Sequence, residues 1–206
     1  MEIFGTNIQL FEEQIRKEFK IKDIGPADLL LGVRIQQLDE CIILNQQHFV
    51  DSLLDLYGMQ NCKTIGTPLV PNESLLPETD EERRTFEEMG INFRSAVGSF
   101  NYLSTVTHPD LSHAVSSLSQ YLEKPGILNF KAFLHILKYL CGTQELGLYY
   151  NRPCNPGLIA FTDADWGNCQ LTQCSTSGYL AKLHGCLIFW KTRKQPLVSI
   201  STAKAE

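Results

Sequence analysis

The chain has 206 residues, 43% of them hydrophobic, and a net charge of -5 from 18 basic and 23 acidic residues. This composition excludes a disordered polyelectrolyte, which would hold fewer apolar residues and carry a larger net charge. The length suits one large domain or two small ones, each able to bury a core. The negative balance argues against a uniformly basic nucleic-acid-binding protein but leaves room for a locally basic groove.

Cysteine usage and the distribution of apolar residues indicate the compartment. The chain has seven cysteines at irregular spacing, and the closest pair, Cys169 and Cys174, has no second pair of Cys or His at zinc-finger distance. Such a set predicts reduced thiols. No apolar run approaches the ~20 residues of a membrane span, and the N-terminus lacks the pattern of a signal peptide. We therefore expect an intracellular protein, cytoplasmic or nuclear, without a membrane partner.

The first third of the chain alternates between helical and extended patterns. Apolar residues recur at helical spacing over residues 8–19, which predicts an amphipathic helix. Two apolar stretches, residues 29–35 and 41–44, flank Asp39-Glu40 like the two arms of a β-hairpin. A second helix is expected to end at Gly58 and to carry an apolar stripe of Phe49, Leu53, Leu56 and Tyr57.

The middle of the chain divides into an acidic segment and a helical one. Residues 67–91 are rich in Pro and Glu, which favours a solvated linker. The following residues, up to about residue 140, show three apolar stripes at helical spacing, and we interpret them as the contacts of a helical core. The stripes are Val97, Phe100 and Leu103; Ala114, Val115, Leu118, Tyr121 and Leu122; and Phe130, Phe133, Leu134, Leu137 and Leu140.

Short strands are predicted in the last quarter, over residues 158–162, 178–183, 186–190 and 197–200, and then the start of a helix with a Ser or Thr cap. His184-Gly185 suits a tight turn between the second and third strands. Asp163 and Asp165 follow the first strand, and their spacing places both carboxylates on one face if the strand continues. Carboxylates so arranged can bind Mg²⁺, whereas the simpler interpretation is that they end a strand and cap a turn.

A series of residue strings in a fixed order resembles the Pol polyprotein of copia-type LTR retrotransposons over nearly the whole chain. Each string is weakly specific alone, and their common order carries the resemblance. They are Asp23-Ile24-Gly25-Pro26, Leu30-Leu31-Gly32-Val33, Thr67-Pro68-Leu69, Phe93-Arg94-Ser95-Ala96-Val97-Gly98, His108-Pro109-Asp110-Leu111, Leu137-Lys138-Tyr139-Leu140, Thr162-Asp163-Ala164-Asp165-Trp166, Ser175-Thr176-Ser177-Gly178-Tyr179 and Lys194-Gln195-Pro196.

The resemblance implies an α+β fold with four regions. Residues 1–66 correspond to the end of a reverse transcriptase palm with a primer-grip-like hairpin, and residues 67–91 to the acidic, Pro-rich linker. Residues 92–150 correspond to a helical thumb and connection segment. Residues 157–206 correspond to the N-terminal part of a ribonuclease H-like α/β domain, which is incomplete in this sequence.

The same resemblance assigns site residues. Asp163 matches the first metal-binding Asp of the ribonuclease H site and Glu206 matches its Glu, which implies that both are catalytic and bind Mg²⁺. Asp165 would be a supporting carboxylate. Lys204 stands where the family string has a Glu, so in the alternative register a cation would replace the metal ligand.

Two substitutions and two absences weaken the expectation of activity. Gln173-Cys174 replace an Arg-Lys pair of the family, and His108 replaces an Arg before Pro109-Asp110, so contacts to phosphate or to a carboxylate would be lost or become pH-dependent. The Tyr-x-Asp-Asp motif of the polymerase would lie before Met1, and the remaining ribonuclease H carboxylates would lie beyond Glu206. We therefore expect neither active site to be complete.

The leading hypothesis is a piece of a retrotransposon polymerase, with reverse transcriptase and ribonuclease H segments, that is inactive alone. Its expected partners are an RNA–DNA hybrid or template–primer and the rest of the Pol polyprotein. The alternative is a non-catalytic nucleic-acid-binding module that uses Lys191, Arg193 and Lys194 beside Trp190, although an ordinary solvated edge would look the same. A stand-alone hydrolase using Asp163 and Asp165 has little support, because no motif links a His to a nucleophile.

Overall fold

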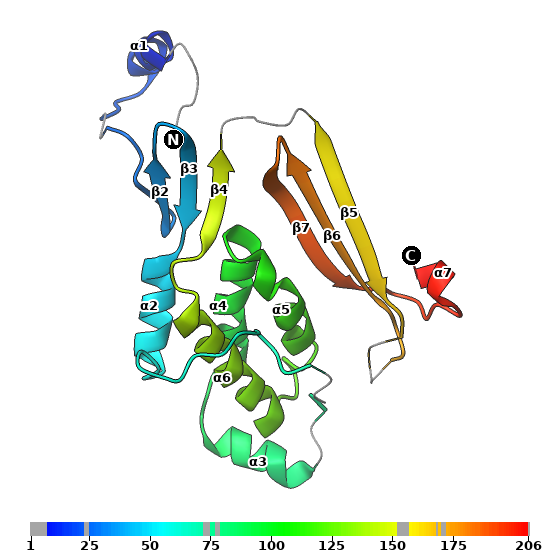
Figure 1. Cartoon of the computed structure of the whole chain (residues 1–206). Coiled ribbons are helices and arrows are strands. Elements are labelled where there is room, and N and C mark those ends of the chain that lie inside the picture. The colour runs from blue at the N-terminus through cyan, green and yellow to red at the C-terminus, as the bar shows by residue number, and fades with distance from the viewer. Residues whose placement is uncertain are drawn as a thin grey trace.

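The computed structural model describes residues 8–22, 25–71, 75–76, 79–151, 157–167, 169 and 172–205. Within these residues, a four-stranded antiparallel sheet and a three-stranded antiparallel sheet border one bundle of helices (Figure 1). We call them sheet A and sheet B. The mixture of helices and antiparallel sheets confirms the predicted α+β class.

Sheet A begins with the hairpin region predicted from the sequence, but the first arm is not one strand. Helix α1 (Ile8–Glu18) precedes β1 (Leu29–Leu30), β2 (Val33–Gln37) and β3 (Cys41–Asn45). The turn between β2 and β3 lies at Asp39-Glu40, as predicted. A second turn interrupts the first arm because Leu31 and Gly32 both adopt positive φ, at 49° and 79°, and fold β1 back onto β2.

The fourth strand of sheet A, β4 (Gly147–Asn151), follows the whole helical bundle in the sequence. It pairs with β3 along its whole length, from Asn45 opposite Gly147 to Cys41 opposite Asn151. The close approach requires a glycine, since a Cβ at Gly147 would overlap the carbonyl oxygen of Leu44. No strand was predicted here.

The bundle buries the apolar stripes that the sequence predicted. Phe100, Leu103 and Phe133 have 0–1% of their surface exposed, and the Phe100 and Phe133 rings stack at 4.7 Å between centroids. Leu56 is an exception, because it is 73% exposed at the end of α2. The elements are α2 (Gln47–Leu56), α3 (Asp80–Glu88), α4 (Phe93–Val106), the 3₁₀ turn η1 (Pro109–Leu111), α5 (Ser112–Ser119) and α6 (Ile127–Gly142).

The acidic segment is more structured than a solvated linker, because it contains α3. Thr79 caps this helix, accepting a hydrogen bond from the backbone of Glu82, while the Glu82 carboxylate accepts one from the backbone of Thr79. One aromatic residue, Phe86, is only 4% exposed and meets the Phe93 ring edge-on at 5.8 Å. A polar helix is thus docked on the bundle through a single apolar side chain.

Sheet B is an antiparallel meander of β5 (Leu158–Asp165), β6 (Thr176–Leu183) and β7 (Cys186–Lys194). The turn between β6 and β7 lies at His184-Gly185, both with positive φ, which confirms that prediction. The fourth predicted strand, residues 197–200, is wrong: this stretch bends and leads into the short helix α7 (Thr202–Ala205). The predicted helix start after Ser201 is confirmed.

Candidate nucleic-acid interface and carboxylate site

The two candidate carboxylates lie on the same face of β5. The strand register places Asp163 opposite Gly178 and Thr192, and Asp165 opposite Thr176 and Lys194. Because directly opposed residues share a face in an antiparallel sheet, this face also carries Trp190. We call it the inner face, since the Trp190 indole donates a hydrogen bond to the carbonyl oxygen of Ser104 in α4 at 2.6 Å.

The inner face attaches sheet B to the bundle near β7 but leaves β5 open. Lys194 donates a hydrogen bond from Nζ to Oε1 of Gln120, just after α5, at 3.0 Å. Both Asp163 and Asp165 are exposed. The predicted pair of carboxylates therefore exists on one face and is open to solvent.

The described residues contain no cluster of three or more metal-ligating side chains. Mg²⁺ is bound by several oxygen ligands, and among the described residues no group of three or more His, Cys, Asp or Glu side chains lies close enough to hold a metal ion. Glu206, the second predicted ligand, lies outside the described residues. Mg²⁺ usually keeps several water ligands, so Asp163 and Asp165 alone would leave most of its coordination to water or to phosphate oxygens of a substrate.

The segment that leads to Glu206 is anchored firmly, but to the other face of sheet B. The Gln195 amide donates to Ser177 Oγ at 2.8 Å and to the carbonyl oxygen of Ala205 at 2.6 Å, and Ala205 is buried. Ser177 precedes Gly178 in β6, so it points away from the Asp163 face. The Trp166 indole adds a hydrogen bond to the carbonyl oxygen of Ser199 at 2.8 Å. Helix α7 thus lies beside the end of β5 (Figure 1).

The predicted cationic cluster is divided between the two faces. Successive side chains of a strand point to opposite faces, so Lys191 and Arg193 lie on the face of β7 that is opposite to Lys194, which we call the outer face. They pair with Tyr179 and Ser177, and both cations are exposed. Tyr179 and Phe189 on this face are 40% and 51% exposed. The outer face thus combines two exposed cations with two aromatic rings, whereas Lys194 is hydrogen-bonded to Gln120 of the bundle.

Three polar side chains of the bundle, His108, Asp110 and Tyr139, lie in contact with one another, and the sequence did not predict this cluster. The Tyr139 hydroxyl donates to Asp110 Oδ2 at 2.8 Å, and His108 Nδ1 lies 3.5 Å from Asp110 Oδ1, at ion-pair distance. His108 is only 1% exposed. The sequence offered a signal for this contact, since the basic family residue at position 108 suggested a carboxylate partner. Nothing in the sequence pointed to Tyr139.

These contacts shift two pKa values in opposite directions. Burial raises the pKa of the Asp110 carboxyl, but the neighbouring His108 and Tyr139 outweigh it and leave the pKa below its ordinary value. Burial, together with the hydrogen bond to Asp110, raises the pKa of Tyr139 far above its ordinary value. Both shifts favour an ionised Asp110 and a neutral Tyr139 in the folded bundle.

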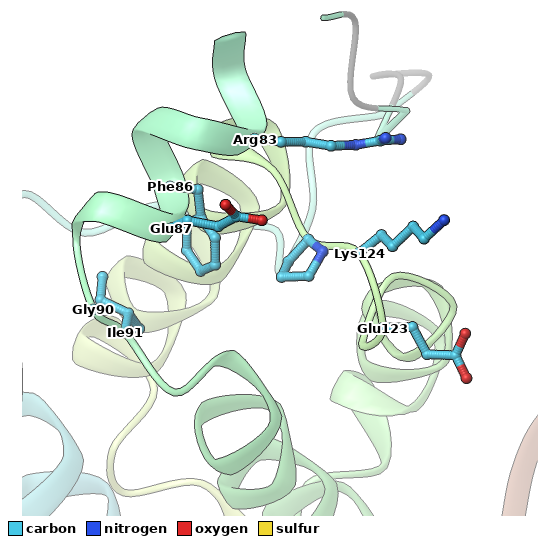
Figure 2. A pocket seen from close by; sticks show the side chains of 8 residues that line it. Arg83, Phe86, Glu87, Gly90, Ile91, Glu123 and Lys124 are labelled. Atoms are coloured by element: carbon cyan, nitrogen blue, oxygen red, sulfur yellow. The ribbon is translucent and has the colours of Figure 1, made fainter. Parts of the chain in front are cut away.

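A cavity of about 460 Å³ lies between α3 and the connection from α5 to α6. Figure 2 shows Arg83 and Lys124 extending in the same direction from its two sides, with Glu87 and Glu123 close by and Phe86 at its wall. Its charges are balanced, and it lies at the end of the bundle opposite sheet A (Figure 1). It therefore belongs to neither the carboxylate face nor the cationic outer face.

A membrane-crossing helix is absent from the described part of the chain, because no helix there is long and apolar enough. The comparisons with known proteins are more specific. Residues 3–71 match the family model described as reverse transcriptase (RNA-dependent DNA polymerase). Enzymes of this family act on nucleic acids and generally use divalent metal ions. No solved structure gives a significant match to the chain.

Three relatives match nearly the whole chain. An uncharacterized mitochondrial protein of Arabidopsis thaliana is 33% identical over 98% of this chain and 82% of its own length. The retrovirus-related Pol polyprotein from transposon TNT 1-94 of Nicotiana tabacum is 34% identical over 93% of the chain, and that from transposon RE1 of Arabidopsis thaliana is 30% identical over 94%. The chain spans only 15% and 13% of these two polyproteins. By this similarity, the chain belongs to the copia-type family of retrotransposon Pol polyproteins.

Proposed function

We propose that the chain is a non-catalytic part of a retrotransposon polymerase that joins the end of the reverse transcriptase to the start of a ribonuclease H domain. In this proposal, residues 1–66 are the end of the palm, residues 92–150 the thumb and connection, and residues 157–206 the first part of the ribonuclease H domain. The observation that carries it is Asp163, exposed on the first strand of the sheet B meander. Its position fits a nuclease carboxylate that needs further ligands.

The number of carboxylates supports the proposed inactivity of the isolated chain. Phosphodiester hydrolysis with two metal ions uses several carboxylates around the ions, and Asp163 and Asp165 are the two that sheet B presents together. The 206-residue sequence contains no Tyr-x-Asp-Asp string for nucleotide incorporation. In this proposal, both active sites need acidic groups beyond those that Asp163, Asp165 and Glu206 supply.

The experiment is a pair of activity assays on the purified chain with Mg²⁺ or Mn²⁺. We expect no nucleotide incorporation on a template–primer and no cleavage of an RNA–DNA hybrid above the buffer background. The matched variant is Asp163→Asn. Hybrid cleavage by the natural chain that disappears in Asp163→Asn would overturn the proposal of inactivity and would establish the role of the carboxylate.

A second candidate function, a nucleic-acid grip without chemistry, is supported by the outer face. Lys191 and Arg193 can each contact a phosphate, and Tyr179 and Phe189 offer ring faces on which unpaired bases can stack. Both contacts are independent of nucleotide sequence, as binding to a template–primer or an RNA–DNA hybrid requires. The substrate class of this face is therefore a nucleic acid strand recognised through its backbone and base stacking.

The test is binding of a labelled template–primer with an RNA–DNA hybrid and a single-stranded template overhang, measured by fluorescence anisotropy over a range of salt concentrations. Changing Lys191 and Arg193 together to Ala should weaken binding at low salt and reduce the slope of log affinity against log salt by about 2. Lys194→Ala is the matched control, because its ammonium is bonded to Gln120 on the other face. If Lys194→Ala weakens binding as much as the double change, or if the natural chain does not bind at low salt, the outer face is not a nucleic-acid-binding surface.

A further inference from the structure

Two cysteines that are 79 residues apart in sequence meet where the segment after α2 crosses the last turn of α6. The Cys141 thiol donates to the carbonyl oxygen of Gln60 at 3.4 Å, and its Sγ lies 4.0 Å from the carbonyl oxygen of Cys62. Burial raises the pKa of Cys62, and the neighbouring Cys141 thiol, which interacts with the Cys62 side chain, raises it further. The two sulfur atoms are thus neighbours in the folded chain.

Contacts on both sides of this crossing hold the two backbones in place. The rings of Tyr57 and Phe133 meet edge-on at 4.8 Å between centroids, before the crossing. At the crossing itself, a Cβ added at Gly142 would lie 3.0 Å from Cβ of Thr64, so the segments are in close contact. Further along, His135 Nε2 lies 3.1 Å from the carbonyl oxygen of Thr67. The two segments are therefore held side by side where the thiols meet.

The local environment leaves both cysteines partly exposed and lowers the thiolate fraction of Cys62. Both residues are half-buried, so neither is sealed in the core of the bundle. Lys138, one turn before Cys141 on α6, lowers the pKa of Cys62, but burial and the second thiol outweigh this effect. Because the thiolate is the reactive form, oxidation of Cys62 should be faster at alkaline pH.

The other described cysteines are placed differently. Cys169 and Cys174 are both buried, and the Cys169 thiol donates to Oε1 of Gln120 at 3.4 Å. The Cys186 thiol donates to the carbonyl oxygen of Asn151 at 3.6 Å. The contact between Cys62 and Cys141 joins two segments of the bundle, whereas Cys169 and Cys174 belong to one loop between β5 and β6.

We propose that Cys62 and Cys141 are a reversible oxidation site that forms a disulfide on reaction with a peroxide. One thiolate attacks an oxygen of hydrogen peroxide, breaks the O–O bond and becomes a sulfenic acid; the hydroxide that leaves takes up the proton lost by that thiol and forms one water. The second thiolate attacks the sulfenic sulfur, forms the S–S bond and expels hydroxide, which takes up the proton lost by the second thiol and forms the second water. Two thiols lose two electrons and two protons, and one peroxide is reduced to two waters. The product ties the segment after α2 to α6.

The bond closes a loop that contains α3, α4, α5 and most of α6, so it restricts the unfolded chain strongly. We expect the oxidised protein to show a thermal midpoint higher by roughly 5 °C or more, reversed by dithiothreitol. The site is independent of the proposed function, because neither cysteine lies in sheet B.

The experiment treats the full chain with hydrogen peroxide, counts free thiols under denaturing conditions and maps linked peptides by mass spectrometry without reduction. The count should fall from the seven cysteines of the sequence by two, and the linked peptides should contain Cys62 and Cys141. Either Cys62→Ser or Cys141→Ser should abolish both the linked peptide and the rise in thermal midpoint.

Cys41→Ser and Cys174→Ser are the matched controls and should retain the linkage. The Cys41 control also removes an ambiguity, because no Lys or Arg separates Cys41 from Cys62 and trypsin leaves both in one peptide. A linkage mapped to Cys169 and Cys174, or a thiol count that stays at seven after peroxide, would overturn the proposal. The count needs only the natural chain, so it remains decisive if a Ser variant fails to fold.

Discussion

The helical bundle and sheet B differ in how far their apolar residues are buried. In the bundle, Phe100 and Ile136 are fully buried. In sheet B, Leu158, Phe161 and Phe189 are 66%, 54% and 51% exposed. Helices can cover one another on several sides, whereas a three-stranded sheet covers itself on neither face. The bundle therefore supplies a core of its own, and sheet B supplies a layer whose surfaces are available for other contacts.

The sharpest test of this contrast is the loss of one aromatic ring from each region. Phe100→Ala should cost roughly 3–5 kcal/mol of unfolding free energy, because the side chain leaves a cavity in a close-packed core. Phe161→Ala should cost less than about 1 kcal/mol, because over half of that ring already faces water. Urea unfolding followed by circular dichroism measures both. Similar losses would show that sheet B is packed more completely than its exposure indicates.

A pair of glycines extends the comparison to the two sheets. Gly147→Ala should cost roughly 2 kcal/mol or more, since its Cβ would overlap the Leu44 carbonyl and open the pairing of β3 with β4. Gly178→Ala should change stability by about 0.5 kcal/mol or less, because nothing lies within 4 Å of its Cβ position. The same unfolding experiment applies. A neutral Gly147→Ala would mean that β4 can move away without loss.

The polar group inside the bundle predicts how its stability depends on pH. Asp110 has a lowered pKa, so its contribution is present above the ordinary pKa of 3.8 and is lost as the pH falls through the folded value. Tyr139 has a raised pKa, so its contribution is present below pH 10 and is lost as the pH rises above that value. Tyr139→Phe should cost about 1–2 kcal/mol at neutral pH, because Asp110 loses a donor.

The control for this prediction is the alkaline part of the same curve. In the natural chain, the unfolding free energy should decline above pH 10, and the decline should be smaller in Tyr139→Phe. Unfolding in urea at a series of pH values gives both curves. Identical slopes above pH 10 would show that Tyr139 ionises without penalty in the folded bundle.

The smallest expected effect concerns the junction between the two regions. Trp190→Phe removes the hydrogen bond to the carbonyl oxygen of Ser104 and should cost about 1 kcal/mol, with faster amide hydrogen exchange in β7. Trp166→Phe is the control, because its indole bonds to Ser199 within the C-terminal segment. If both changes affect β7 equally, sheet B is not held to the bundle through Trp190.

Local periodicity was enough to predict most of the bundle from the sequence. The stripe of Val97, Phe100 and Leu103 is buried as expected, because helical spacing fixes which side chains share a face. Helix α3 was missed because its sequence is almost entirely polar and Phe86 alone docks it. The strand expected at residues 197–200 was wrong because an apolar run also suits a bend whose polar groups are bonded to Gln195 and Trp166.

The sequence predicted which residues form the candidate site, but not on which face of sheet B each of them lies. Asp163 and Asp165 share a face because β5 continues to Asp165, a condition that the sequence could only suppose. Lys194 separates from Lys191 and Arg193 through the pairing register of β6 and β7. Register depends on partners distant in sequence, so no pattern within residues 191–194 could assign their directions. The contact of Tyr139 with Asp110 was hidden for the same reason.

The strand β4 has a consequence for how the protein acquires its structure. Leu44 pairs with Leu148, a separation of 104 residues, so the edge of β3 stays unpaired during synthesis until the whole helical bundle has left the ribosome. A recombinant piece limited to residues 3–71, the span of the reverse transcriptase match, would lack this strand. Such a piece would present an open β3 edge that favours aggregation. The smallest soluble unit containing the hairpin should therefore extend through residue 151.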